Sequence, residues 1–296
     1  MELRIKNISK TYSNGVCALD NITITIKKGM FGLLGPNGAG KSTLMRIIAT
    51  LQEADSGTIF LEDINVLTQK NRVRRILGYL PQEFGLYPNI NAEVLLDHLA
   101  VLKGISPHRD RRKLVHAILH KTNLYHERKK NLGGFSGGMK QRFGIAQVLL
   151  NSPRLIIVDE PTAGLDPAER NRFLNLLSEI GENTIVILST HIVDDVKELC
   201  PDMAIIHEGK LLFRDDPREA VKKYNGMVWQ KRIPKEALKD YQDKHNIITR
   251  KMIAGMLEIH VLNENEPGGD FLPTTAELED VYFSTILEYE QALPVN

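Results

Sequence analysis

The sequence predicts an α/β fold with a parallel sheet at its centre and a smaller lobe at the C-terminal end. Residues 155–160 and 184–191 are short runs rich in β-branched residues, which are typical of strands buried on both faces. A third apolar run, at residues 31–34, leads into a glycine-rich stretch and then into helical spacing up to residue 51. The chain of 296 residues is long enough for one large domain with a small appendage.

The N-terminal third predicts further strands. Residues 3–12 and 21–29 alternate in polarity and flank Asn14-Gly15, a hairpin turn signal. We therefore expect an antiparallel β subdomain here. Residues 58–64 and 76–81 also have the composition of strands.

The middle of the chain predicts a helical subdomain at about 85–150. Its helical spacing falls in residues 90–104, 111–124 and 140–152. A further helix is expected near 169–180, between the two buried strands. Residues 204–214 then predict a hairpin around Glu208-Gly209.

The hydrophobic pattern starts anew after about residue 222, which predicts a small C-terminal α/β domain at 222–296. We expect a strand at 227–233, a helix at 234–245, strands at 247–253 and 256–263, a loop at 266–270 and a closing helix at 276–290.

Composition limits the function classes. The 38 basic and 37 acidic side chains nearly cancel, so no nucleic-acid partner is expected. The two cysteines have no metal-ligand spacing, which favours a reduced, cytoplasmic setting. No apolar run approaches the roughly 20 residues that span a bilayer, and the N-terminal residues lack a signal core. Any membrane part is thus expected from other subunits.

Residues 35–43 fit the phosphate-loop pattern G-x-x-x-x-G-K-[ST] at every position. A glycine-rich turn that binds nothing is the alternative, and the strand before the motif and the helix after it weigh against that alternative. In such a loop backbone N–H groups surround phosphate oxygens, Lys41 reaches the β- and γ-phosphates, and Ser42 offers a hydroxyl to Mg²⁺. The predicted nucleotide-binding residues are Asn37, Gly38, Ala39, Gly40, Lys41, Ser42 and Thr43.

Two adjacent acids end the buried strand at 155–160. Neighbouring strand side chains point in opposite directions, so the two can act differently. Asp159 can hold Mg²⁺ through water, and Glu160 can polarise the attacking water. The loop and these acids together predict a P-loop NTPase that uses Mg²⁺, and they leave open which kind.

Residues 135–142, Phe-Ser-Gly-Gly-Met-Lys-Gln-Arg, closely resemble the signature motif of the ABC ATPase family, usually written LSGGQ. The resemblance implies a sandwich dimer of two ATPase domains, formed with a second copy or with a paralogous domain. Ser136, Gly137 and Gly138 of one chain would then cap the γ-phosphate held by the other. Phe135 is an apolar replacement of the usual Leu, whereas Met139 removes the usual Gln and so leaves catalytic strength open.

Four further residues match ABC landmarks in the family's order, and the resemblance covers residues 1–221. It implies that Tyr12 stacks on adenine and that Gln82 contacts Mg²⁺ and reports the nucleotide state. It also implies that Asp166 lies in a loop crossing the dimer interface, and that His191 acts near the γ-phosphate as a catalytic residue with Lys41, Gln82 and Glu160.

The tail at 273–282 and the stretch at 80–104 resemble ATPases paired with export-type permeases. The implied partner is a separate transmembrane permease, with the chain peripheral at the cytoplasmic face of the membrane. Phe84, Leu86 and Tyr87 would either dock the permease or pack within the helical subdomain.

Two alternatives remain. One is a soluble ABC ATPase without a permease, acting in cofactor assembly or regulation, which the neighbouring genes would distinguish. The other is a pure binding module, which would require a broken site. The intact Lys41, Asp159, Glu160 and His191 place it last.

Overall fold

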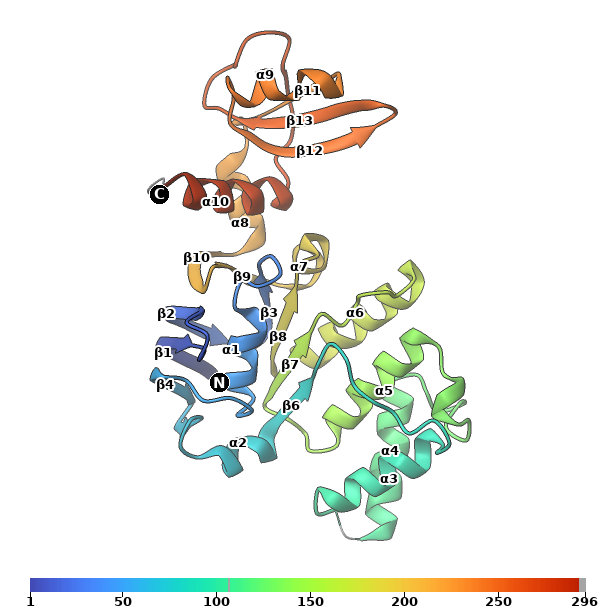
Figure 1. The fold of residues 1–296 in the computed structure, drawn as a ribbon. Helices are drawn as coiled ribbons and strands as arrows, with labels where there is room; N and C mark the ends of the chain where they lie inside the picture. The colour runs from blue at the N-terminus through green and yellow to red at the C-terminus, as the bar shows by residue number, and fades with distance from the viewer. Residues whose placement is uncertain (106, 293–296) are drawn as a thin grey trace.

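The computed structural model describes residues 1–105 and 107–292 and contains three sheets (Figure 1). The central sheet has six strands in the order β10-β9-β3-β8-β7-β6, and only the β9/β10 pair is antiparallel. This arrangement confirms the predicted α/β class. The strands are β3 (Gly29–Leu34), β6 (Leu77–Leu80), β7 (Leu155–Asp159), β8 (Ile185–Thr190), β9 (Asp202–His207) and β10 (Lys210–Asp215).

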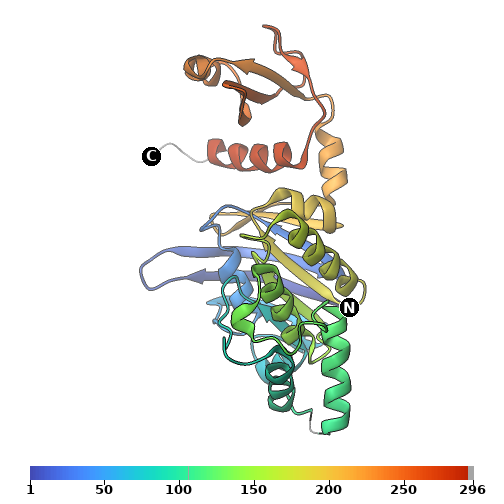
Figure 2. The ribbon, with the colours of Figure 1, turned by 90° about the vertical axis from the view of Figure 1, so that its right-hand side faces the viewer.

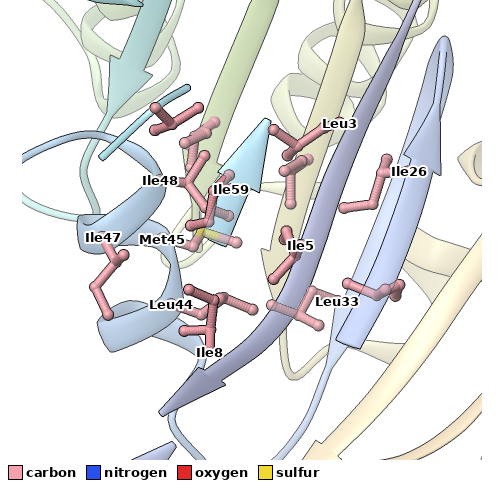
Figure 3. Packing of buried hydrophobic residues seen from close by; sticks show 14 of the residues in the cluster. Leu3, Ile5, Ile8, Ile26, Leu33, Leu44, Met45, Ile47, Ile48 and Ile59 are labelled. Carbon is pink, nitrogen blue, oxygen red and sulfur yellow. The ribbon is translucent and has the colours of Figure 1, made fainter. Parts of the chain in front are cut away.

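An antiparallel sheet of order β2-β1-β4-β5 packs against one face of the central sheet. Side chains alternate between buried and exposed at the start of β1, as expected for a strand with one face on a core, and an irregularity at Asn7, with φ 52°, then returns Ile8 to the buried face. Its Leu3, Ile5 and Ile8 meet Leu44 and Met45 of helix α1 (Lys41–Ile48) in one apolar cluster (Figure 3). The strands are β1 (Glu2–Thr11), β2 (Cys17–Lys27), β4 (Ser56–Leu61) and β5 (Ile64–Asn65).

Three helices form the helical subdomain: α3 (Ala92–Leu102), α4 (His108–Lys121) and α5 (Gly137–Leu149). They share a separate apolar core that includes Leu96, Leu119 and Phe143. The short 3₁₀ helix η1 (Leu132–Gly134) leads into α5. This cluster lies beside the β6 end of the central sheet (Figure 1).

The second face of the central sheet is covered by α6 (Pro167–Gly181), α7 (Val193–Leu199) and α10 (Leu278–Ala292). Alternation along β3 explains how one strand serves two cores. Phe31 and Leu33 face the antiparallel sheet, whereas Met30 and Leu34 face these helices.

The C-terminal lobe contains an antiparallel sheet of order β12-β13-β11-β14. Helix α8 (Pro217–Tyr224) leads into it, and α10 lies between this sheet and the central domain (Figure 2). Leu278, Val281 and Tyr282 of α10 join the core under the central sheet, so the lobe's closing helix is also part of that core. The strands are β11 (Val228–Ile233), β12 (Ile247–Ile253), β13 (Met256–Leu262) and β14 (Leu272–Pro273). The predicted boundary at 221/222 falls inside α8 and stays a prediction.

The structure corrects several expectations. The strand expected at 58–64 is interrupted, because Glu62 takes φ 54° and turns the chain from β4 into β5. The helix expected at 234–245 is only a 3₁₀ turn, η2 (Lys235–Ala237), followed by α9 (Leu238–Gln242). Neither segment contains a buried residue, so packing adds little to a helix that is too short to be stable alone. Four elements were not predicted from the sequence: α2 (Lys70–Ile76), α7, α8 and β14.

Within the described residues, no helix combines the length and the apolar character that crossing a bilayer requires. Cys17 and Cys200 are both free thiols.

Candidate nucleotide site

The glycine-rich loop connects β3 to α1 and approaches its neighbours very closely. Gly40 is the N-cap of α1, with φ 103°. A side chain at this position would overlap the Ala18 carbonyl oxygen of β2. Glycine is therefore required both by the left-handed backbone and by the close approach of β2. The loop leaves the N-terminal end of α1 open to an anion.

Lys41 lies in the first turn of α1 and is only 5% exposed. Its Nζ donates to the carbonyl oxygens of Gly35 at 2.7 Å and Pro36 at 3.0 Å. Burial lowers the pKa of Lys41, while the charges of Glu160 and Asp159 act in the opposite direction. The hydrogen bonds given for this ammonium group thus go to two backbone carbonyl oxygens, and an anion would bind it more strongly.

A cavity of about 440 Å³ opens over this loop. It is lined on one side by the loop and on the others by the β1–β2 connection and two polar residues from the central sheet region. The lining residues are Tyr12, Val16, Cys17, Ala18, Asn37, Gly38, Ala39, Gly40, Lys41, Ser42, Thr43, Gln82 and Glu160. The structure therefore brings together the predicted loop residues, Tyr12, Gln82 and Glu160.

Tyr12, which directly follows β1, lines the cavity. Its hydroxyl lies 3.0 Å from Oγ1 of Thr43 and donates to Oε1 of Gln52, and these two hydrogen bonds, that with Thr43 first, lower the pKa of Tyr12. Val16, Cys17 and Ala18 also line the cavity and were not predicted from the sequence. Their position directly after the Asn14-Gly15 turn, opposite Tyr12, was the signal that could have found them.

Glu160 follows the last residue of β7 and is held by two other segments. Its N–H donates to the carbonyl of Ser189 at 2.9 Å. Gln82 Nε2 donates to its Oε2 at 3.3 Å, and Nδ1 of His191 lies 3.2 Å from its Oε1. His191 is half-exposed at the end of β8. Three of the predicted catalytic residues thus meet at the carboxyl ends of neighbouring strands.

Asp159 is buried beside this group, and its Oδ1 has no hydrogen-bond partner among the described residues. A buried carboxylate oxygen without a partner is costly unless a cation or an ordered water satisfies it. Ser42 contributes a hydroxyl and Gln82 an amide from the cavity wall. This set of oxygen donors fits a hard divalent cation such as Mg²⁺.

The residues of the signature segment lie elsewhere. Ser136 is the N-cap of α5 and its Oγ accepts from the Met139 N–H at 3.2 Å. Gly138 packs so closely on Glu169 that a side chain would overlap the Glu169 carboxylate. Asp166 is the N-cap of α6 and accepts from the Glu169 N–H at 2.9 Å. Among the described residues, the cavity lining does not include Ser136, Gly137, Gly138 or Asp166.

The three apolar residues that follow Gln82 differ in their burial. Phe84 packs on the core beneath the central sheet, against Gly144, and Leu86 packs on the core of the helical subdomain. Tyr87 is 66% exposed. Only Tyr87 of these three therefore presents most of its side chain to a partner.

Comparisons with known proteins agree on one family. The family model described as "ABC transporter" matches residues 19–163. An uncharacterised ABC transporter ATP-binding protein of Bacillus subtilis, YxlF, is 35% identical over 73% of this chain and 72% of its own length. The linearmycin resistance ATP-binding protein LnrL of B. subtilis is 35% identical over 71% of this chain and 68% of its own. The bacitracin transport ATP-binding protein BcrA of Bacillus licheniformis is 35% identical over 75% and 72%, respectively.

Solved structures show the same fold. An ATP-binding cassette, dimeric in a post-hydrolysis state with bound ADP and phosphate, superposes with a TM-score of 0.65. It is 27% identical and covers 72% of this chain and 98% of its own.

Proposed function

The chain belongs to the family of ABC transporter ATP-binding proteins, and from this membership we propose that it binds and hydrolyses Mg-ATP as a dimer to drive a membrane exporter. One observation carries the proposal. The cavity over the glycine-rich loop joins a buried lysine to a carboxylate held by a glutamine and a histidine. That combination suits phosphoryl transfer to water.

Different residues of the cavity would bind different parts of the nucleotide. Lys41 would exchange its two carbonyl partners for phosphate oxygens, which are stronger acceptors for an ammonium group. Tyr12 would stack on the base, since it is the aromatic residue that lines the cavity. The loop between them would surround the phosphates with backbone N–H groups.

Glu160 would orient the attacking water and accept its proton. Its carboxylate borders the cavity, and Gln82 and His191 hold one oxygen each. Ser42, Gln82 and Asp159 would hold Mg²⁺. When bound, this ion supplies positive charge to the oxygens of the transferred phosphoryl group.

The dimer is proposed because the signature segment cannot serve the cavity of its own chain. Ser136 and Gly137 lie at the N-terminal end of α5, outside that cavity. A second chain would bring its own helix end to the γ-phosphate. The dimeric form of the ADP-bound cassette with the same fold supports this arrangement.

We further propose that the ATPase drives export through a separate permease. Two relatives are named for linearmycin resistance and for bacitracin transport. The exposed Tyr87, close in sequence to Gln82, would lie at the permease contact. The chain would then act at the cytoplasmic face of the membrane, with residues 1–221 as the ATPase domain and 222–296 as an accessory domain.

The test is light scattering of purified Glu160→Gln with and without Mg-ATP. We expect a monomer without nucleotide and a dimer with it, because the variant would bind ATP without consuming it. A matched variant, Glu160→Gln with Gly137→Asp, places a negative charge where the γ-phosphate of the other chain would lie. A Cβ added at Gly137 lies 3.7 Å from Leu165, an ordinary contact, so we expect the substitution to leave the monomer fold intact.

We expect the double variant to bind Mg-ATP and remain monomeric. A dimer in both variants would contradict the role of the signature segment. Failure of the single variant to bind Mg-ATP would contradict the nucleotide site itself.

A further inference from the structure

The turn between β9 and β10 contacts the nucleotide loop directly. The N–H of Gly209 donates to the carbonyl of Ala39 at 2.9 Å, and its own carbonyl accepts from the N–H of Asp20 at 2.8 Å. Gly209 has φ 76°, and a side chain there would lie 2.8 Å from the Ala18 carbonyl oxygen. The turn is therefore held against β2 and the loop with no space between them.

The loop has little freedom on its other side. A side chain at Gly40 would overlap the Ala18 carbonyl oxygen and lie 3.5 Å from Cα of Gly209. The loop, β2 and the β9–β10 turn thus meet at one point. Any shift of the turn must move Ala39 or break its hydrogen bond.

Helix α10 holds the opposite side of the same turn. The ring of Tyr289 packs edge-on against His207, with centroids 5.7 Å apart and planes at 85°. Nζ of Lys210 lies 5.6 Å from the centroid of the same ring. Glu290 adds a carboxylate oxygen 3.5 Å from Nε2 of His207. The two residues that flank Glu208-Gly209 are therefore both bound to one aromatic side chain.

Charge links this contact to β2 as well. Nζ of Lys210 lies 3.8 Å from the Asp20 carboxylate, and a hydrogen bond to Tyr289 raises the pKa of Lys210. Asp20 is the residue whose N–H binds Gly209. Tyr289 thus contacts the turn at two positions and reaches β2 through Lys210.

We infer that Tyr289 is a positioning residue for the nucleotide site: by holding His207 and Lys210 it fixes the Glu208-Gly209 turn, and through Gly209 it fixes the loop carbonyl of Ala39. The inference rests on the proposed function, since it concerns the same cavity. Tyr289 would then give the C-terminal lobe a role in nucleotide affinity, because α10 also contacts the sheet of that lobe. Asp280 of this helix lies 2.7 Å from Nδ1 of His260 in β13, so movement of the lobe reaches Tyr289 through α10.

The test compares full-length Tyr289→Ala with Phe283→Ala, a truncation of an exposed aromatic residue on the same helix. The Kd for Mg-ATP is measured by titration with a fluorescent ATP analogue. Amide hydrogen exchange is followed at residues 36–42. We expect Tyr289→Ala to raise Kd about three- to tenfold, the scale of one aromatic contact, and to speed exchange in the loop. Phe283→Ala should leave both within about twofold of wild type.

A wild-type Kd together with wild-type exchange at residues 36–42 in Tyr289→Ala would overturn the inference. So would equal changes in both variants. If Tyr289→Ala unfolds, Tyr289→Leu decides in its place, because leucine keeps the apolar packing of the helix but not the ring or the hydroxyl. If the wild-type chain does not bind Mg-ATP, the proposed function fails instead, which is a separate result.

Discussion

Nδ1 of His191 lies 3.2 Å from Oε1 of Glu160, so the ends of strands β8 and β7 meet at one carboxylate. Glu160 also takes φ 46°, a conformation that costs a non-glycine residue about 1–3 kcal/mol. Its N–H bond to Ser189 holds it there. The contact between side chains from adjacent strands holds this carboxylate, which borders the cavity.

Removing the charge of Glu160 should separate binding from turnover. We expect Glu160→Gln to lower the ATPase rate by about 100-fold or more, because the water loses its proton acceptor. The Kd for Mg-ATP should stay within about threefold. Phosphate release assays and nucleotide titration measure the two quantities. Glu182→Gln, an exposed acid with the same charge change, is the control. Normal turnover in Glu160→Gln would contradict the assigned role.

Lys41→Ala should weaken Mg-ATP binding about tenfold or more, the scale of one charge-assisted hydrogen bond. Isothermal titration of the folded variant gives the Kd. Lys28→Ala removes an exposed lysine outside the cavity and should bind as wild type does. An unchanged Kd in Lys41→Ala would argue against the loop as the phosphate site.

Burial of Lys41 also predicts a pH dependence of stability. Its pKa is lower in the folded than in the unfolded chain, mainly because of burial. Between these two pKa values the unfolded chain binds more protons, so this group's contribution to the free energy of unfolding rises with pH. The contribution is complete above the unfolded lysine value and is lost as the pH falls through the folded value.

The measurement is urea unfolding of the nucleotide-free wild type and Lys41→Met across the alkaline range. The free energy of wild type should increase relative to that of Lys41→Met as the pH rises toward the ordinary lysine pKa. A constant difference would mean that Lys41 keeps an ordinary pKa in the folded protein.

The loop and the buried strands could be predicted because their signals are local. Residues 35–43 contain the whole phosphate-loop motif in consecutive positions, and β7 and β8 are continuous apolar runs. Helix α8 was missed although Asp216 before Pro217 is a start signal for a helix, and Asp216 does cap the first turn. Helix α8 could therefore have been predicted from the sequence.

Other features depend on tertiary contacts that a sequence pattern does not contain. Helix α7 has only seven residues, too few for a clear periodicity, and Val196 fixes it by packing over Gly32, where no side chain fits. The partners of Glu160 come from positions 82 and 191, more than 30 residues away on either side. The contact of Tyr289 with His207 likewise joins the end of the chain to the central sheet.

Alanine substitution should destabilise the fold by different amounts at two glycines of the loop. Gly38 has φ 82° and open space around its missing side chain, whereas alanine at Gly40 would also overlap the Ala18 carbonyl oxygen. We expect Gly38→Ala to cost about 1–2 kcal/mol of folding free energy, from backbone strain alone. Gly40→Ala should cost about 1–3 kcal/mol more, because the overlap must be relieved by a backbone shift. Urea unfolding without nucleotide measures both, and equal losses would show that the close approach to β2 carries no strain.

Asp195 should be the acid whose removal costs the most stability in the central domain. It is fully buried in α7, where Oδ2 accepts from the Thr162 hydroxyl at 2.7 Å and Oδ1 from Nε of Arg170 at 2.7 Å. Asp195→Ala leaves a buried hydroxyl and a guanidinium without their acceptor, which should lower the free energy of unfolding by about 3 kcal/mol. Asp194→Ala, at the exposed neighbouring position, should change it by less than about 0.5 kcal/mol. Urea unfolding of both variants gives the comparison. A loss below about 1 kcal/mol in Asp195→Ala would mean that water reaches Thr162 and Arg170 and replaces the carboxylate.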